Sequence, residues 1–136
     1  MKNDELKVQN INIEDKIYNI RGLQVMLDRD LAELYGVETK VLNQAVKRNF
    51  ERFNEVDFMF KLTDNEFKIL KSQFVTSSWG GIRKIPYVFT EQGVYMLATV
   101  LKSSVAINIT KQIMRTFLQM KIFYKLILLF LRDLKE

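Results

Sequence analysis

The stretch LAELYGVETKVLNQAVKRN, residues 31–49, decides the fold. Apolar side chains recur at helical spacing on both sides of Gly36, a residue that suits a tight turn because it tolerates positive φ. The two apolar stripes are Leu31, Leu34 and Tyr35, then Leu42, Ala45, Val46, Asn49, Phe50 and Phe53. The pattern predicts two helices joined by a short turn, with the second helix over residues 39–52.

This stretch also meets the requirements of a helix-turn-helix. The small Ala32 lies where the second helix would cross the first, Gly36 follows four residues later, and the apolar Val37 can fill the corner. Leu42 and Ala45 fall on the side of the second helix that must be buried. The spacing favours a helix-turn-helix, although such corners also occur in proteins that bind no DNA.

The side of the second helix that faces away from Leu42 is polar. Amide side chains can form paired hydrogen bonds with adenine in the major groove, while Lys and Arg can bind guanine or neutralise phosphates. The candidate DNA contacts on this helix are Thr39, Lys40, Asn43, Gln44, Lys47, Arg48 and Arg52. The alternative is a surface helix with an ordinary solvated face.

Composition bounds the possible chemistry. The 136 residues suit one domain, and 48% hydrophobic with 27% charged residues is ordinary for a globular protein. The sequence has no Cys and no His. Disulfides, zinc sites with Cys or His ligands, and Ser-His or Cys-His catalytic units are therefore excluded.

Charge and hydropathy indicate the kind of partner. The net charge of +5 suits an anionic partner such as nucleic acid. The first 16 residues are polar and lack the apolar core of a secretory signal. The most apolar stretch, residues 122–131, is about half the length that a membrane-spanning helix needs. We therefore expect a cytoplasmic protein of a bacterial or infected cell that does not bind membranes.

Two short strands are predicted before the helix-turn-helix. They cover residues 16–20 and 23–27 around a glycine turn, after a flexible tail over residues 1–14. Asp28 follows the second strand, and its carboxylate can accept from amides of a first helical turn, so we expect it to be an N-cap.

A third strand and a capped helix are predicted after it. The strand covers residues 57–62. Thr63 and Glu66 have the spacing of a capping box, in which each side chain accepts from the backbone amide of the other residue, and the helix should end near Lys71.

A hairpin with a basic tip is predicted next. Residues 73–78 and 82–89 flank Trp-Gly-Gly at 79–81, and Pro86 suits an edge strand or a strand end. Such a wing can contact the DNA backbone beside a recognition helix, and its candidate contacts are Ser77, Ser78, Arg83 and Lys84. The alternative is an ordinary exposed hairpin with Trp79 in the core.

The end of the chain is predicted to hold two helices. Thr90 can cap one over residues 91–101, and Ser103 or Ser104 can cap a long one from about Val105. The long helix has apolar residues at the alternating spacing of four and three that forms a coiled-coil seam. The candidate self-association residues, which follow Ile113 in this seam, are Phe117, Met120, Tyr124, Ile127, Leu131 and Leu134. Alternatives are that the early part packs on the domain core, or that the exposed end once met a further domain.

The chain resembles the KilA-N-type DNA-binding domain of phages and large DNA viruses, and most closely its branch named for the N-terminal domain of phage open reading frame six. The resemblance covers about residues 15–120. The residues that carry it lie at 17–28, 31–37, 48–49, 52–53, 57–60, 62–63, 76–81, 86–87, 89–94, 96–97, 106–108 and 113–117. It implies DNA binding, often in phage or prophage gene control.

Two departures from the family pattern stand out. The family usually reads Phe-Pro-x-Asp-Phe after the second helix, whereas residues 53–58 read FNEVDF, without the proline and one residue longer. Relatives often carry a C-terminal regulatory or antirepressor domain, whereas this sequence stops at Glu136.

We therefore expect an α+β domain over residues 15–120 with a helix-turn-helix core, small wing-like hairpins and a long C-terminal helix that extends over 121–136. The leading hypothesis is a non-enzymatic DNA-binding regulator or antirepressor-type protein without a cofactor, a metal or a small-molecule substrate. Its partners would be double-stranded DNA and a second copy of the chain. One alternative is a protein-interaction module that acts on a repressor or host protein. Another is a metal-dependent nuclease that uses Asp28, Asp30 and Glu33, although a helix would direct Asp28 and Asp30 differently.

Overall fold

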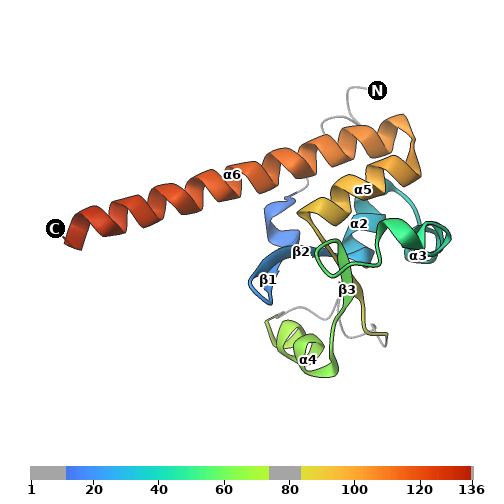
Figure 1. The fold of residues 1–136 in the computed structure, drawn as a ribbon, viewed down its shortest axis with the longest axis horizontal. Coiled ribbons are helices and arrows are strands. Elements are labelled where there is room, and N and C mark those ends of the chain that lie inside the picture. Colours follow the sequence, from blue (N-terminus) through green and yellow to red (C-terminus); the bar gives the residue numbers. More distant parts are fainter. Residues whose placement is uncertain (1–11, 74–83, 136) are drawn as a thin grey trace.

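The computed structural model describes residues 12–73 and 84–135 and has an α+β fold (Figure 1). Its elements, in chain order, are the 3-10 helix η1 (Glu14–Lys16), β1 (Ile17–Ile20), β2 (Leu23–Leu27), α2 (Asp28–Tyr35), α3 (Thr39–Arg48), the 3-10 helix η2 (Phe50–Arg52), β3 (Met59–Lys61), α4 (Asp64–Ser72), β4 (Tyr87–Thr90), α5 (Glu91–Leu101) and α6 (Ser104–Lys135).

The four strands form one antiparallel sheet in the order β1-β2-β4-β3. β2 and β4 are its central strands. Alternate side chains of a strand point to opposite faces of the sheet, and both of these strands bury side chains on both faces. Met26 and Phe89, which are directly opposite each other in the β2–β4 pair, belong to one core. Leu27 and Val88, the next opposing pair, belong to the other.

The sheet therefore separates two apolar cores. On one face it contributes to the larger core with α2, α3, α5 and the first part of α6. On the other face α4 packs through Phe67 and Leu70, as Figure 1 shows with α4 below the sheet and α5 and α6 above it. This layered arrangement holds α2 and α3 at one side of the domain, with the outer face of α3 in solvent.

A polar contact joins the β1–β2 turn to α4. Arg21 adopts a left-handed conformation, with φ of 57°, and donates from Nε and Nη2 to the two carboxylate oxygens of Glu66 at 2.8 and 2.9 Å. The Glu66 carboxylate also accepts from the Thr63 amide, and Thr63 Oγ1 accepts from the Glu66 amide. The predicted capping box is thus confirmed, and its Glu has a second role across the fold.

α5 begins where the sheet approaches it closely. Thr90 caps the helix by accepting from the Gly93 amide at 3.1 Å. A Cβ atom at Gly93 would lie 2.0 Å from the carbonyl oxygen of Phe58, so only glycine fits at this position. The carbonyl of Phe58 is fixed there because it also accepts from the Thr90 amide.

α6 has two different halves. Ser103 caps it by accepting from the Ala106 amide at 3.0 Å, which confirms one of the two predicted caps. The helix packs on the domain as far as Phe117, which is fully buried, and residues 121–135 are all exposed. Figure 1 shows this second half extending well beyond the rest of the fold.

Several predicted boundaries are confirmed and others are wrong. The first two strands, the helix after Thr63 and the position of Pro86 just before a strand are confirmed. The helix predicted over 39–52 ends at Arg48 instead, because Asn49 leaves the helical region with φ of −120° and ψ of 37°, and a 3-10 turn follows. The strand predicted over 57–62 is limited to Met59–Lys61.

Other corrections concern single residues. Asp28 is the first residue of α2, and Leu27 occupies the N-cap position. Ile13 is buried, so the tail predicted over 1–14 extends too far into the domain. Phe50 is exposed and Ala45 is half-buried, whereas both were expected in the core. The predicted wing over 73–89 lies mostly outside the described residues.

Candidate nucleic-acid interface

The turn between α2 and α3 is fixed by its own backbone. Gly36 has φ of 73° and ψ of 30°, the left-handed conformation that ends many helices. Its amide donates to the carbonyl of Glu33 at 3.1 Å, and the amide of Val37 donates to the carbonyl of Ala32 at 3.0 Å. This pair of bonds is a Schellman motif, and Val37 packs against the core beside it.

α3 presents one face to the core and another to solvent. Leu42 and Val46 are buried, with 0% and 4% of their surface exposed. The exposed side chains of the helix are Lys40, Val41, Gln44, Lys47 and Arg48, whereas Thr39 is half-buried. At 3.6 residues per turn the exposed ones lie within an arc of about 120°. The helix contains three cations and no carboxylate.

Asn43 differs from its neighbours on α3. It is half-buried, and its Nδ2 donates to Oδ2 of Asp28 at 3.0 Å. The same Asp28 oxygen accepts from the amide of Tyr87 at 3.3 Å, while Oδ1 accepts from the amide of Arg29 at 2.7 Å. Asp28 is itself 5% exposed. Asn43 therefore contributes to the attachment of α3 to α2 and to β4.

Two more polar groups of α2 are buried in the scaffold. The hydroxyls of Tyr35 and Thr110 are hydrogen-bonded at 2.8 Å, which attaches the end of α2 to α6, and burial raises the pKa of Tyr35 to about 12. Asp30 is 7% exposed with Lys16 Nζ at 3.9 Å from Oδ1, and burial raises the pKa of its carboxyl group.

Burial of Tyr18, with the nearby charges of Asp30 and Asp15, raises the Tyr18 pKa to about 12.

The region after α3 holds the remaining predicted contacts. Arg52 is exposed on η2, where Nη1 donates to Oγ1 of Thr99 in α5 at 2.8 Å. Lys84 is exposed, while the other predicted hairpin contacts, Ser77, Ser78 and Arg83, lie outside the described residues. The structure thus places Lys40, Gln44, Lys47 and Arg48 together on one surface, with Arg52 one short 3-10 turn further along the chain.

Two apolar side chains beside these cations were not predicted as contacts. Val41 is 46% exposed and Phe50 is 57% exposed. Val41 is within the solvent arc of α3, where an apolar group can contact the methyl group of thymine. On the helical wheel Val41 lies at the edge of the polar arc, about 100° from Leu42 and about 140° from Val46, which was a signal available in the sequence.

The acidic residues of α2 are dispersed. Asp28 is occupied by its three hydrogen-bond donors, Asp30 is buried, and Glu33 is exposed. Over residues 12–73 and 84–135, no three acidic side chains gather in a way that could hold a metal ion.

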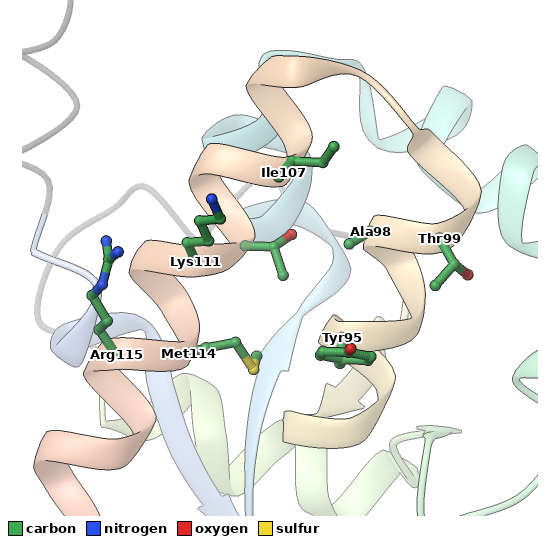
Figure 2. Close-up of a pocket in the computed structure, with 8 residues that line it drawn as sticks. Tyr95, Ala98, Thr99, Ile107, Lys111, Met114 and Arg115 are labelled. Atoms are coloured by element: carbon green, nitrogen blue, oxygen red, sulfur yellow. The ribbon is translucent and has the colours of Figure 1, made fainter.

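A pocket of about 500 Å³ lies between α5 and α6 (Figure 2). Thr110 in its wall is bonded to Tyr35, and Thr99 is bonded to Arg52 and to the carbonyl of Met96. Its walls are therefore mainly apolar, with two cations from α6. The residues around it are Tyr95, Ala98, Thr99, Ile107, Thr110, Lys111, Met114 and Arg115.

The predicted self-association residues are divided between the core and the surface. Phe117 is fully buried in the domain core, so it is not available to a partner, and Met120 is half-buried. Tyr124, Ile127, Leu131 and Leu134 are exposed. In the part of the chain that the structure describes, no helix has both the length and the hydropathy to cross a bilayer.

The fold is thus an α+β domain that exposes the basic face of the second helix in a helix-turn-helix arrangement. Residues 15–100, more than half of the chain, match the ORF6N domain, and the chain belongs to this family. The family is named for the N-terminal domain of phage open reading frame six and indicates a phage-type protein. No curated protein and no solved structure matches the chain.

Proposed function

We propose that this chain is a phage- or prophage-encoded protein that binds double-stranded DNA and acts in transcription regulation, as a regulator or antirepressor-type protein. We further propose that its fold is of the KilA-N type, and that it acts in the bacterial cytoplasm without catalysis. The observation that supports DNA binding best is the solvent arc of α3, which combines three cations and an amide with no carboxylate.

The dimensions of α3 suit the major groove. A helix fits into this groove, and its exposed side chains from Lys40 to Arg48 extend over about 12 Å at 1.5 Å per residue. Gln44 lies near the middle of the arc, where its amide can bond to adenine. Lys40, Lys47 and Arg48 surround it, where they can neutralise phosphates or bind guanine.

The buried face explains how the helix would keep its orientation. Leu42 and Val46 hold α3 on the core, and the Asp28–Asn43 hydrogen bond attaches it to α2. We therefore propose that Asn43 orients the helix and that Gln44 reads base edges. The exposed Arg52 lies one short 3-10 turn beyond α3 and donates a hydrogen bond to Thr99 of α5. We propose that it contacts the DNA backbone from there.

The test is a salt titration of duplex binding by fluorescence anisotropy, on sites selected from a random duplex pool. Lys47→Ala and Arg48→Ala should each weaken binding to all duplexes and reduce the salt slope by about one. Gln44→Ala should relax the preference at one position, at a cost of roughly 1–3 kcal/mol on the selected site.

Lys125→Ala is the matched control. It removes the same charge from the exposed half of α6, far from α3 in Figure 1, and should leave the salt slope unchanged. Binding by all three α3 variants that equals the parent would refute this interface. Tight binding to a repressor or host protein, with no salt-dependent affinity for DNA, would instead support a protein-interaction module.

A further inference from the structure

We propose that the exposed half of α6 is a self-association surface, which packs against the same segment of a second copy of this chain. The proposal does not depend on DNA binding. It rests on the abrupt change along α6, where Phe117 is fully buried and every residue from 121 to 135 is exposed. Apart from Lys121 at its start, whose ammonium group donates to the Glu91 carboxylate of α5, this half of the helix has no polar partner within the described part of its own domain.

The size of the apolar surface matches a protein interface. Eleven large apolar side chains between residues 118 and 134 are 39% to 67% exposed: Leu118, Ile122, Phe123, Tyr124, Leu126, Ile127, Leu128, Leu129, Phe130, Leu131 and Leu134. With roughly 200 Å² for each side chain, they expose on the order of 1,000 Å². Patches on monomers rarely exceed a few hundred Å², whereas a standard interface buries about 800 Å² on each partner.

The spacing of these residues indicates a helical partner. Met120, Tyr124, Ile127, Leu131 and Leu134 follow one another at intervals of four, three, four and three residues. This is the seam spacing of helices that pack side by side in a coiled coil. The same helix in a second copy has the matching spacing, so the seam is complementary to itself.

The charged residues favour a second copy over a lipid surface. None of the five seam positions is charged, and Lys121, Lys125, Arg132 and Lys135 lie within an arc of about 80° beside the seam. Asp133, however, lies between Ile122 and Leu126 on the helical wheel. Insertion of the whole apolar arc into lipid would bury this carboxylate at high cost, whereas packing through the seam leaves it in solvent.

The first test is the mass of the full chain by sedimentation equilibrium, over a series of micromolar concentrations. We expect a mass of at least twice the 16.1 kDa of one chain. Ile127→Glu should weaken the association at least about tenfold, because it places a carboxylate in an apolar contact. Lys125→Glu, which makes a comparable change outside the seam, should retain the association. Circular dichroism verifies that both variants keep their helices.

A second test uses the absence of cysteine from the sequence. Ile127→Cys should form a covalent dimer under mild oxidation, and Lys125→Cys should form much less. A chain that is monomeric at every concentration, or equal cross-linking at both positions, would overturn the proposal. Flotation of a monomeric chain with phosphatidylglycerol vesicles would also overturn it and would assign the surface to lipid.

Discussion

Asn43 Nδ2 in α3 donates a hydrogen bond to Oδ2 of Asp28 in α2, 3.0 Å away. Asp28 is almost completely buried and also accepts from the backbone amides of Arg29 and Tyr87. One carboxylate thus joins both helices of the helix-turn-helix to strand β4. We therefore expect the orientation of the proposed recognition helix to depend on a group that is almost completely buried.

The first prediction concerns Asp28. Asp28→Ala should lower the free energy of unfolding by about 2–4 kcal/mol, because it leaves the amide of Asn43 and the backbone amide of Tyr87 without their acceptor. Asp28→Asn retains one side-chain oxygen and should cost less. Urea denaturation of the two variants and the parent measures the difference. A loss below about 0.5 kcal/mol for Asp28→Ala would show that water replaces the carboxylate.

The second prediction separates two neighbouring amides. Asn43→Ala should lower the free energy of unfolding by about 1–2 kcal/mol because it breaks the bond to Asp28. Gln44→Ala removes an exposed side chain and should change it by no more than about 0.5 kcal/mol. Thermal unfolding followed by circular dichroism compares them. Equal stabilities would mean that Asn43 does not hold the helix.

Local sequence signals predicted the helix-turn-helix well. Gly36 and Val37 form the turn through bonds to Glu33 and Ala32, which are only three to five residues away. The capping box of Thr63 and Glu66 and the Thr90 cap are equally local. Short-range chemistry of this kind is contained in the spacing of a few residues, so the sequence alone predicts it.

Local signals of this kind could not predict the contacts between residues that are far apart in the sequence. Asn43 shares a polar helix face with Gln44 in the sequence, but its partner Asp28 is 15 residues away, and Asp28 also binds Tyr87, 59 residues further on. The burial of Phe117 likewise depends on packing against distant elements. Periodicity identifies a face but does not identify what covers it.

The third prediction concerns the turn glycine. Gly36→Ala should cost about 1–2 kcal/mol, since φ of 73° is unfavourable for a residue with a Cβ atom even though the space around Gly36 is open. Gly36→Asn should cost less, because Asn tolerates this conformation better. Urea denaturation measures both. If the two variants are equally stable, steric strain at this φ is not what limits the turn.

The fourth prediction concerns a glycine whose surroundings, unlike those of Gly36, leave no space for a Cβ atom. Gly93 is in α5, where a Cβ atom would meet the Phe58 carbonyl at 2.0 Å. Gly93→Ala should cost about 2 kcal/mol or more, because backbone must move to relieve the contact. Ala98, half-buried on the same helix, provides a comparison through Ala98→Gly, which should cost about 1 kcal/mol. A Gly93→Ala chain as stable as the parent would exclude this close approach.

The fifth prediction is a pH dependence that originates at Glu66. The hydrogen bonds that the Glu66 carboxylate accepts from the Arg21 guanidinium and from the Thr63 amide lower the pKa of Glu66 from 4.5 to about 2. A carboxyl group whose pKa is lower in the folded state stabilises the fold above its unfolded pKa and loses this effect as the pH falls through the folded value. Glu66→Gln should therefore be less stable than the parent at pH 7, by about 1–2 kcal/mol, since the contact is partly exposed to solvent.

The difference between the parent and Glu66→Gln should shrink as the pH falls from about 4.5 towards 2, where the parent carboxylate becomes protonated. Urea denaturation at a series of pH values measures it. Asp64→Asn, in the same first turn of α4, is the matched control, since Asp64 is exposed and has no side-chain hydrogen bond within the described residues. A difference for Glu66→Gln that stays constant down to pH 2 would mean that the Arg21 contact does not depend on the charge of Glu66. The link between the β1–β2 turn and α4 would then come from the packing of Arg21 on the Phe60 ring, 4.1 Å away.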